Sequence, residues 1–195
     1  MKKIFLVGLI GLIYSAAQSQ AQVGIGIKGG LNFANVNTSS PSTAYNSRTG
    51  YHLGAFALFK FSKIGIQPEL LFSRQGSSLS ASGTTADLSF DYLNIPIILK
   101  LYTVAGINIQ VGPQFGFLSS ATQTFNGTTT DVKSTVKGSD ISLAMGLGWD
   151  LPFGLLIDAR YNLGLSEINN TSGSTAAKNQ VIQISAGFKI FNFGK

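Results

Sequence analysis

Eight charged residues of this chain stand beside apolar neighbours, where a charge needs a partner. Asp158 and Arg160, for example, are separated only by Ala159. Opposite charges that share an enclosed space form ion pairs, and buried ionisable groups can also serve as proton relays or line ion paths. We expect a structural ion-pair network, whose predicted members are Lys28, Glu69, Asp158, Arg160, Lys60, Lys100, Asp150 and Lys189.

His52 is the only histidine, and the chain contains no cysteine. A catalytic role would make His52 the base for a nucleophilic serine. However, no serine lies nearby on the same strand face, and no carboxylate stands at a spacing that would orient the ring. A metal site would need clustered His, Cys or carboxylate ligands, which the sequence does not supply. We therefore predict no catalytic residue, no metal site and no cofactor.

Two glycine pairs, Gly24 with Gly26 and Gly146 with Gly148, superficially resemble phosphate-binding motifs. Both pairs stand inside extended stretches, whereas a phosphate-binding loop joins a strand to a helix. The expected role of these glycines is to make room in a narrow interior or to permit strand curvature.

The elements that carry these residues are stretches in which apolar side chains alternate with small, polar or charged ones. Alternation with a period of two is typical of strands that have one apolar face. The clearest stretch, residues 139–151, places Leu143, Met145 and Leu147 on one face and Gly146 and Gly148 on the other. The eight predicted strands are residues 23–34, 49–61, 64–76, 88–101, 106–118, 139–151, 154–166 and 179–193.

The composition favours a membrane barrel. Charged residues make up only 11% of the chain, whereas soluble domains average about 25%. No later stretch is as long as a membrane helix, so a closed barrel is the spanning structure that satisfies every backbone group. A soluble barrel of the lipocalin type would have the reverse polarity, with its charges outside. The predicted fold is an all-β, eight-stranded antiparallel up-and-down transmembrane β-barrel.

The amino terminus predicts a secretory signal peptide. Lys2 and Lys3 precede an apolar run, residues 4–17, and Ser19 and Ala21 supply the small residues of a cleavage site. We expect cleavage after Ala21, which divides the chain into a signal peptide, residues 1–21, and a barrel domain, residues 22–195. Loss of the two lysines lowers the net charge from +6 to +4, a mild excess that favours anionic lipid headgroups over nucleic acid as the counter-charge.

The connections between the predicted strands indicate an orientation. Short links, such as Ser62-Lys63 and Pro152-Phe153, follow the second, fourth and sixth strands. Short turns belong to the periplasm and long loops to the cell exterior. We therefore expect the outer membrane of a Gram-negative bacterium, with both termini in the periplasm. The long, polar connections are residues 35–48, 77–87, 119–138 and 167–178, of which 122–136 could extend the barrel wall above the membrane.

Aromatic residues near the strand ends predict the girdles that flank the membrane. Arg74 falls on the lipid-facing side at the outer rim, where its guanidinium could contact a lipid phosphate. The predicted girdles comprise Tyr51, Phe72 and Phe117 at the outer rim, and Phe59, Phe61, Tyr102, Trp149, Phe153, Phe191 and Phe193 at the periplasmic rim.

Three segments resemble the outer-membrane β-barrel family labelled PorT-like: residues 23–34 with the core Gly-x-Lys-Gly-Gly-Leu-Asn-Phe, residues 66–73 and residues 92–100. The resemblance covers the whole mature chain in layout. It implies an outer-membrane barrel and, through the founding member of the family, a link to a protein secretion system. The family commonly carries an acidic residue where Asn94 stands, so a role of that carboxylate does not transfer to this chain.

We expect a monomeric, non-enzymatic barrel with a plugged polar lumen, acting structurally or through surface interactions of its loops. The expected partners are outer-membrane lipids, lipopolysaccharide and a surface or secretion-system protein, but not nucleic acid. Two alternatives stay open: a narrow channel for small solutes, and a periplasm-facing accessory of a secretion system. Conductance in planar bilayers distinguishes the first, and loss of secreted proteins on deletion distinguishes the second.

Overall fold

The computed structural model describes residues 22–38, 45–81, 84–166 and 177–193, so the predicted signal peptide lies outside the described residues. No helix within these ranges is long and apolar enough to cross a membrane. The elements are β1 (Gln22–Thr38), β2 (Tyr45–Phe61), β3 (Ile64–Ala81), β4 (Thr84–Tyr102), β5 (Ile107–Phe125), β6 (Thr128–Asp131), the short 3-10 helix η1 (Lys133–Thr135), β7 (Ser139–Asp150), β8 (Leu155–Gly164) and β9 (Ala177–Phe193).

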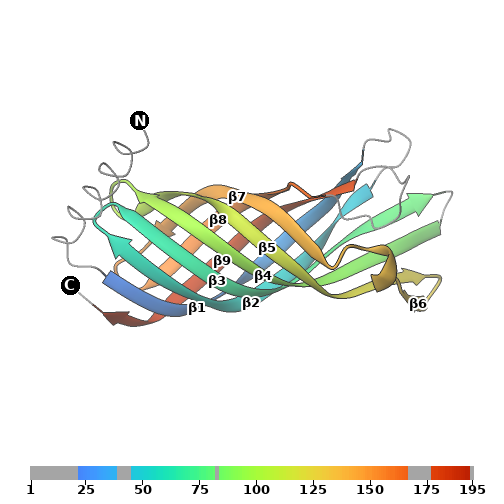
Figure 1. The fold of residues 1–195 in the computed structure, drawn as a ribbon, viewed down its shortest axis with the longest axis horizontal. Coiled ribbons are helices and arrows are strands. Elements are labelled where there is room, and N and C mark those ends of the chain that lie inside the picture. Colours follow the sequence, from blue (N-terminus) through green and yellow to red (C-terminus); the bar gives the residue numbers. More distant parts are fainter. Residues whose placement is uncertain (1–21, 39–44, 82–83, 167–176, 194–195) are drawn as a thin grey trace, which may run out of the picture.

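Eight of the strands close into one antiparallel barrel. Strands β1 to β5 pair in chain order, β7 pairs with β5 and β8, β8 pairs with β9, and β9 returns to β1 to close the ring. Among the described strands, β6 pairs only with the end of β5, and it lies outside the ring. Figure 1 shows β1 starting and β9 ending at one end of the barrel, here called the terminal end, and β6 at the other, here called the loop end. The predicted eight-stranded fold is confirmed.

The predicted alternation of faces is also confirmed. On β9, Ile182 and Ile184 are 49% and 51% exposed, whereas Gln183 and Ser185 are 1% and 3% exposed. The outer face is therefore apolar, and the polar side chains fill the interior. This polarity suits lipid outside the barrel and is the reverse of a soluble ligand-binding barrel.

The strands are longer at the loop end than the sequence pattern predicted. Strand β5 was expected to end near residue 118 but continues to Phe125, where Thr122–Phe125 pair with Thr128–Asp131. Residues 77–81 and 84–87, predicted as a loop, are likewise strand residues that pair with one another. The sequences of these segments show no sustained alternation of large apolar residues, so the hydrophobic pattern did not mark them, yet cross-strand pairing satisfies their backbone groups.

An apolar cluster lies at the loop end of the barrel. Its buried members are Phe90, Tyr92, Leu118 and Ala121, and Leu88, Val132 and Val136 pack against them. The two valines flank η1, directly after β6, so their burial fastens this segment to the barrel wall.

The prediction that Tyr102 belongs to the periplasmic aromatic girdle is wrong. Trp149 and Phe153 are 46% and 66% exposed on the outer face, as expected, but Tyr102 is only 6% exposed. Its hydroxyl donates a hydrogen bond to Asp150 Oδ2 at 2.7 Å. Because its neighbour Leu101 faces outward, the period of two turns Tyr102 into the lumen.

Candidate functional site: the polar lumen

Four charged side chains meet in the central layer of the lumen. Arg160 donates from Nη2 and Nη1 to Glu69 Oε1 and Oε2, at 2.6 and 2.9 Å. Lys28 Nζ lies 2.8 Å from Asp158 Oδ1 and 3.4 Å from Glu69 Oε1, and Arg160 Nε lies 3.2 Å from Asp158 Oδ1. All four side chains are at most 2% exposed. Two cations and two carboxylates thus form one neutral, closed group.

Neutral amides extend this charged group toward the terminal end. Gln67 Nε2 donates to Glu69 Oε1 at 2.7 Å, and Gln110 Oε1 accepts from Arg160 Nε at 2.6 Å. Gln110 then donates to Asn108, which donates to Asp150. Gly148 makes room for these amides, because a Cβ there would lie 2.1 Å from Gln110 Nε2. The predicted space-making role of this glycine agrees with its surroundings.

Asp150 is the centre of a second polar layer, at the terminal end. Its carboxylate accepts from Lys100 Nζ at 2.9 Å, and Lys189 Nζ lies 3.9 Å away. Lys60 approaches no carboxylate of the described residues within ion-pair distance, and its Nζ instead lies 4.2 Å from the centre of the Tyr102 ring. The structure thus divides the eight predicted residues between a central and a terminal layer.

His52 occupies a third layer, on the loop-end side of the central charges. Its Nδ1 lies 2.8 Å from Asn32 Oδ1, and its Nε2 lies 2.9 Å from Ser185 Oγ. The Asn32 Nδ2 group donates to three other oxygens, including Ser73 Oγ, so its Oδ1 faces the histidine. Nδ1 must therefore carry the proton, and Nε2 accepts the Ser185 hydroxyl.

This hydrogen-bond direction is the one that activates a serine nucleophile. The sequence pattern shows no serine near His52 on its own strand face, because Ser185 comes from β9, 133 residues away in the chain. All three groups are deeply buried: Asn32 is 0%, His52 2% and Ser185 3% exposed. No substrate can reach the hydroxyl in this arrangement, so its chemistry is that of a structural clamp between β1, β2 and β9.

Metal ligands do not gather in the described part of the chain, where no group of three His, Cys, Asp or Glu side chains could hold an ion.

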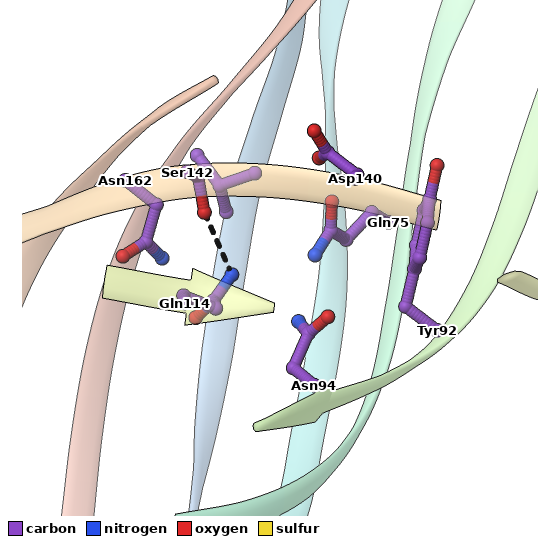
Figure 2. Close-up of a pocket in the computed structure, with 8 residues that line it drawn as sticks. Gln75, Tyr92, Asn94, Gln114, Asp140, Ser142 and Asn162 are labelled. Carbon is purple, nitrogen blue, oxygen red and sulfur yellow. Dashed lines mark hydrogen bonds between the residues drawn. The ribbon is translucent and has the colours of Figure 1, made fainter. Parts of the chain in front are cut away.

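A polar pocket lies in the lumen toward the loop end (Figure 2). It contains about 240 Å³ of space, including the part continuous with solvent, and has room for about one water molecule. Figure 2 shows the amide of Gln114 directed at Ser142, which accepts its hydrogen bond at 3.2 Å. The lining residues are Gln75, Tyr92, Asn94, Gln114, Asp140, Ser142, Asn162 and Val181.

Two buried asparagines of this pocket have polar atoms without a protein partner. These atoms are Nδ2 of Asn94 and both Nδ2 and Oδ1 of Asn162, and the two residues are 1% and 2% exposed. A guest that both donates and accepts hydrogen bonds, such as water or a hydroxyl group, matches this set. Sequence reasoning missed the pocket, although inward parity for Asn94 and Asn162 was a usable signal.

Arg74 lies on the outer face at the loop-end edge of the apolar band. Its Nε and Nη2 donate to the two carboxylate oxygens of Asp91 at 2.7 and 2.9 Å. Asp91 is its direct cross-strand neighbour, a pairing that the sequence pattern did not predict. The Arg74 side chain is still 48% exposed and lies 5.8 Å from the Tyr51 ring, so a lipid phosphate can approach it from outside.

Comparisons with known proteins agree with this geometry. A family model described as outer membrane protein beta-barrel domain matches residues 16–170. Neisserial surface protein A superposes with a TM-score of 0.61 at 12% identity, over 87% of this chain and 99% of that one. The attachment invasion locus protein of Yersinia pestis gives 0.51 at 17% identity, over 90% and 100%. No curated protein matches the sequence.

Proposed function

This chain belongs to the outer membrane protein beta-barrel domain family, and from that premise we propose that it is a non-enzymatic surface protein with a closed lumen. The observation that carries the proposal is the length of the strands at the loop end. A membrane-spanning strand needs about 9–11 residues, whereas β4 and β5 each have 19. About half of each strand is therefore available to build a wall beyond the bilayer.

The change in outward side chains marks where this wall leaves the membrane. On β4, Leu93, Ile97 and Leu99 are exposed apolar residues, and beyond them the outward position is Asp91, paired with Arg74. We assign the Arg74–Asp91 pair to the headgroup level, where a cation costs about 0–1 kcal/mol and can meet a lipid phosphate. Phospholipid and lipopolysaccharide are accordingly the proposed lipid partners.

We propose that the loop end faces the cell exterior and that both termini lie in the periplasm. The turns at the terminal end are short, as between β2 and β3, whereas the loop end carries β6 and η1. At this end β5 and β6 form a polar hairpin, in which Thr128–Asp131 are exposed. This hairpin, on its apolar base of Val132 and Val136, is the proposed contact surface for a partner outside the cell.

Cysteine labelling tests the orientation, because the natural chain has no cysteine. A membrane-impermeant maleimide applied to intact cells should label Thr130→Cys in β6 and should leave Lys63→Cys in the β2–β3 turn unlabelled until the outer membrane is permeabilised. If only Lys63→Cys were labelled on intact cells, the terminal end would face the cell exterior, and the proposed orientation and outer contact surface would be wrong.

Replacement of residues 126–137 by a short Gly-Ser link tests the surface role. Cells producing the natural barrel should adhere to abiotic surfaces or to one another more than cells producing the shortened variant. Heat-modifiable gel mobility of both proteins serves as the folding control. Equal adhesion by both strains would show that the hairpin is not needed for adhesion and would contradict its proposed role as a contact surface.

The PorT-like resemblance supports a second assignment, a secretion accessory, but no contact of the described residues favours it. The channel alternative is opposed by the central layer, where four buried side chains pair across the lumen. Monomeric behaviour is part of the proposal and can be measured by light scattering in detergent.

A further inference from the structure

The terminal layer of the lumen carries more positive than negative charge. Three ammonium groups gather near the carboxylate of Asp150. Lys100 Nζ lies 2.9 Å and Lys189 Nζ 3.9 Å from this carboxylate. Lys60 lies over the ring of Tyr102, whose hydroxyl donates a hydrogen bond to Asp150. Three positive charges and one negative charge leave a net charge of +2 at this end. The central layer, in contrast, has two charges of each sign.

The Asp150 carboxylate has little hydrogen-bond acceptor capacity left for Lys60 and Lys189. Its Oδ1 already accepts from Lys100 at 2.9 Å and from Asn108 at 3.2 Å, and its Oδ2 accepts from Tyr102 at 2.7 Å. Lys189 is at the limit of ion-pair distance. The unbalanced charge therefore resides on Lys60 and Lys189.

These two lysines are also the accessible members of the layer. The side chain of Lys100 is 0% exposed and that of Lys189 is 14% exposed, and Lys60 is partly exposed. Lys60 and Lys189 belong to β2 and β9, the two strands that flank β1. Gly24 of β1 lies beneath Lys189, where a Cβ would come within 3.1 Å of Lys189 Cδ. The missing side chain at Gly24 thus leaves room for the alkyl chain of Lys189 at the terminal opening of the lumen, here called the mouth.

We propose that this mouth binds a phosphate group between the ammonium groups of Lys60 and Lys189. Lysine is a common phosphate ligand, because its ammonium donates charge-assisted hydrogen bonds to the phosphate oxygens. A region with an excess of positive charge concentrates anions, and the low-dielectric barrel wall strengthens this effect. The binding chemistry is independent of the proposed surface role. Only the source of the phosphate, a periplasmic solute or an inner-leaflet lipid headgroup, depends on the proposed orientation.

The test uses the full mature chain refolded in a maltoside detergent, which contains no phosphate. Inorganic phosphate is titrated by calorimetry and by 31P line broadening at low ionic strength. The double variant Lys60→Gln, Lys189→Gln should weaken binding by about tenfold or more, because both charge-assisted contacts are removed. Lys63→Gln is the matched control, since Lys63 is exposed in the β2–β3 turn at the same rim.

Equal phosphate binding by the natural chain and the double variant would overturn the proposal. An equal loss in Lys63→Gln would also overturn it, because general rim charge would then suffice. Absence of phosphate binding to the natural chain in detergent would do the same. Heat-modifiable mobility checks that each variant is folded, and the single variant Lys60→Gln replaces the double variant if the latter does not refold.

A second arm identifies the source of the phosphate. The titration is repeated in phospholipid vesicles with the terminal end accessible. Persistent binding of inorganic phosphate supports a soluble ligand, and its disappearance in vesicles but not in detergent supports occupation by a lipid headgroup.

Discussion

Arg160 and Glu69 face each other across the barrel lumen in a two-point contact, with Nη1 to Oε2 at 2.9 Å and Nη2 to Oε1 at 2.6 Å. Their side chains are 1% and 0% exposed. A planar guanidinium opposite a planar carboxylate gives both strength and geometric specificity. The pair joins β3 to β8, which are not neighbours in the barrel wall, so it braces the lumen from within.

Loss of one partner of this pair should be far more harmful than loss of both. Glu69→Gln or Arg160→Gln alone should lower the free energy of unfolding by about 3–5 kcal/mol, because each leaves a buried charge unpaired, and the double variant should lose much less than the sum. Urea unfolding in lipid vesicles provides the measurement. Strictly additive losses would mean that the two residues are not energetically coupled.

The proposed closed lumen predicts that the purified protein does not conduct ions. Eight strands enclose a space that side chains can fill, and two layers of long charged side chains occupy it. Single-channel recording in planar bilayers should show no stable conductance steps. The control is a misfolded preparation at the same detergent concentration. Reproducible conductance steps from the folded protein that are absent from this control would contradict the closed lumen and support the channel alternative.

Two lumen asparagines should respond differently to an apolar replacement of similar size. Asn32→Leu should destabilise the protein by about 1–3 kcal/mol for each buried group that it strands, since His52, Ser73 and Gln183 all bond to Asn32. Asn162→Leu should cost less, because neither polar atom of Asn162 has a protein partner. The comparison is made by urea unfolding, and an equal or larger loss at Asn162 would show that its guest is tightly held.

Ser185 should be chemically inert in the folded protein despite its hydrogen bond to His52. At 3% exposure, its hydroxyl is out of reach of an active-site reagent. A fluorophosphonate probe followed by peptide mass spectrometry should therefore leave Ser185 unmodified. Modification of Ser185, lost in His52→Gln, would instead identify a working nucleophile and contradict the non-enzymatic assignment.

Arg74 should matter much less for stability than Arg160. It is half exposed and its ion pair with Asp91 lies at the rim, so Arg74→Gln should lower the free energy of unfolding by no more than about 1 kcal/mol. A change in that loss between vesicles with anionic and zwitterionic headgroups would support the phosphate contact. The same loss in both would leave Asp91 as its energetically relevant partner.

The barrel and the facing of its strands were predictable from the sequence, because a period of two is a local property. The face toward which each side chain points follows from its neighbours, because successive side chains point to opposite faces. Gln183, which stands between two isoleucines, must face inward if those isoleucines face lipid. The short turn at Ser62 and Lys63 was equally visible. The loop-end extensions were not, since Thr122–Phe125 gain their strand character from β6 and not from an apolar face.

The grouping of side chains within the lumen was decided by the tertiary structure. Sequence parity placed His52, Ser185, Glu69 and Arg160 inside, and their similar height suggested which charges could pair, but the distances and directions of the contacts depend on the registers of all eight strands and on closure of β9 against β1. The same closure brings Ser185 to His52 across 133 residues of chain. Local alternation selects the face of a residue, whereas its partner is selected by the way the whole ring closes.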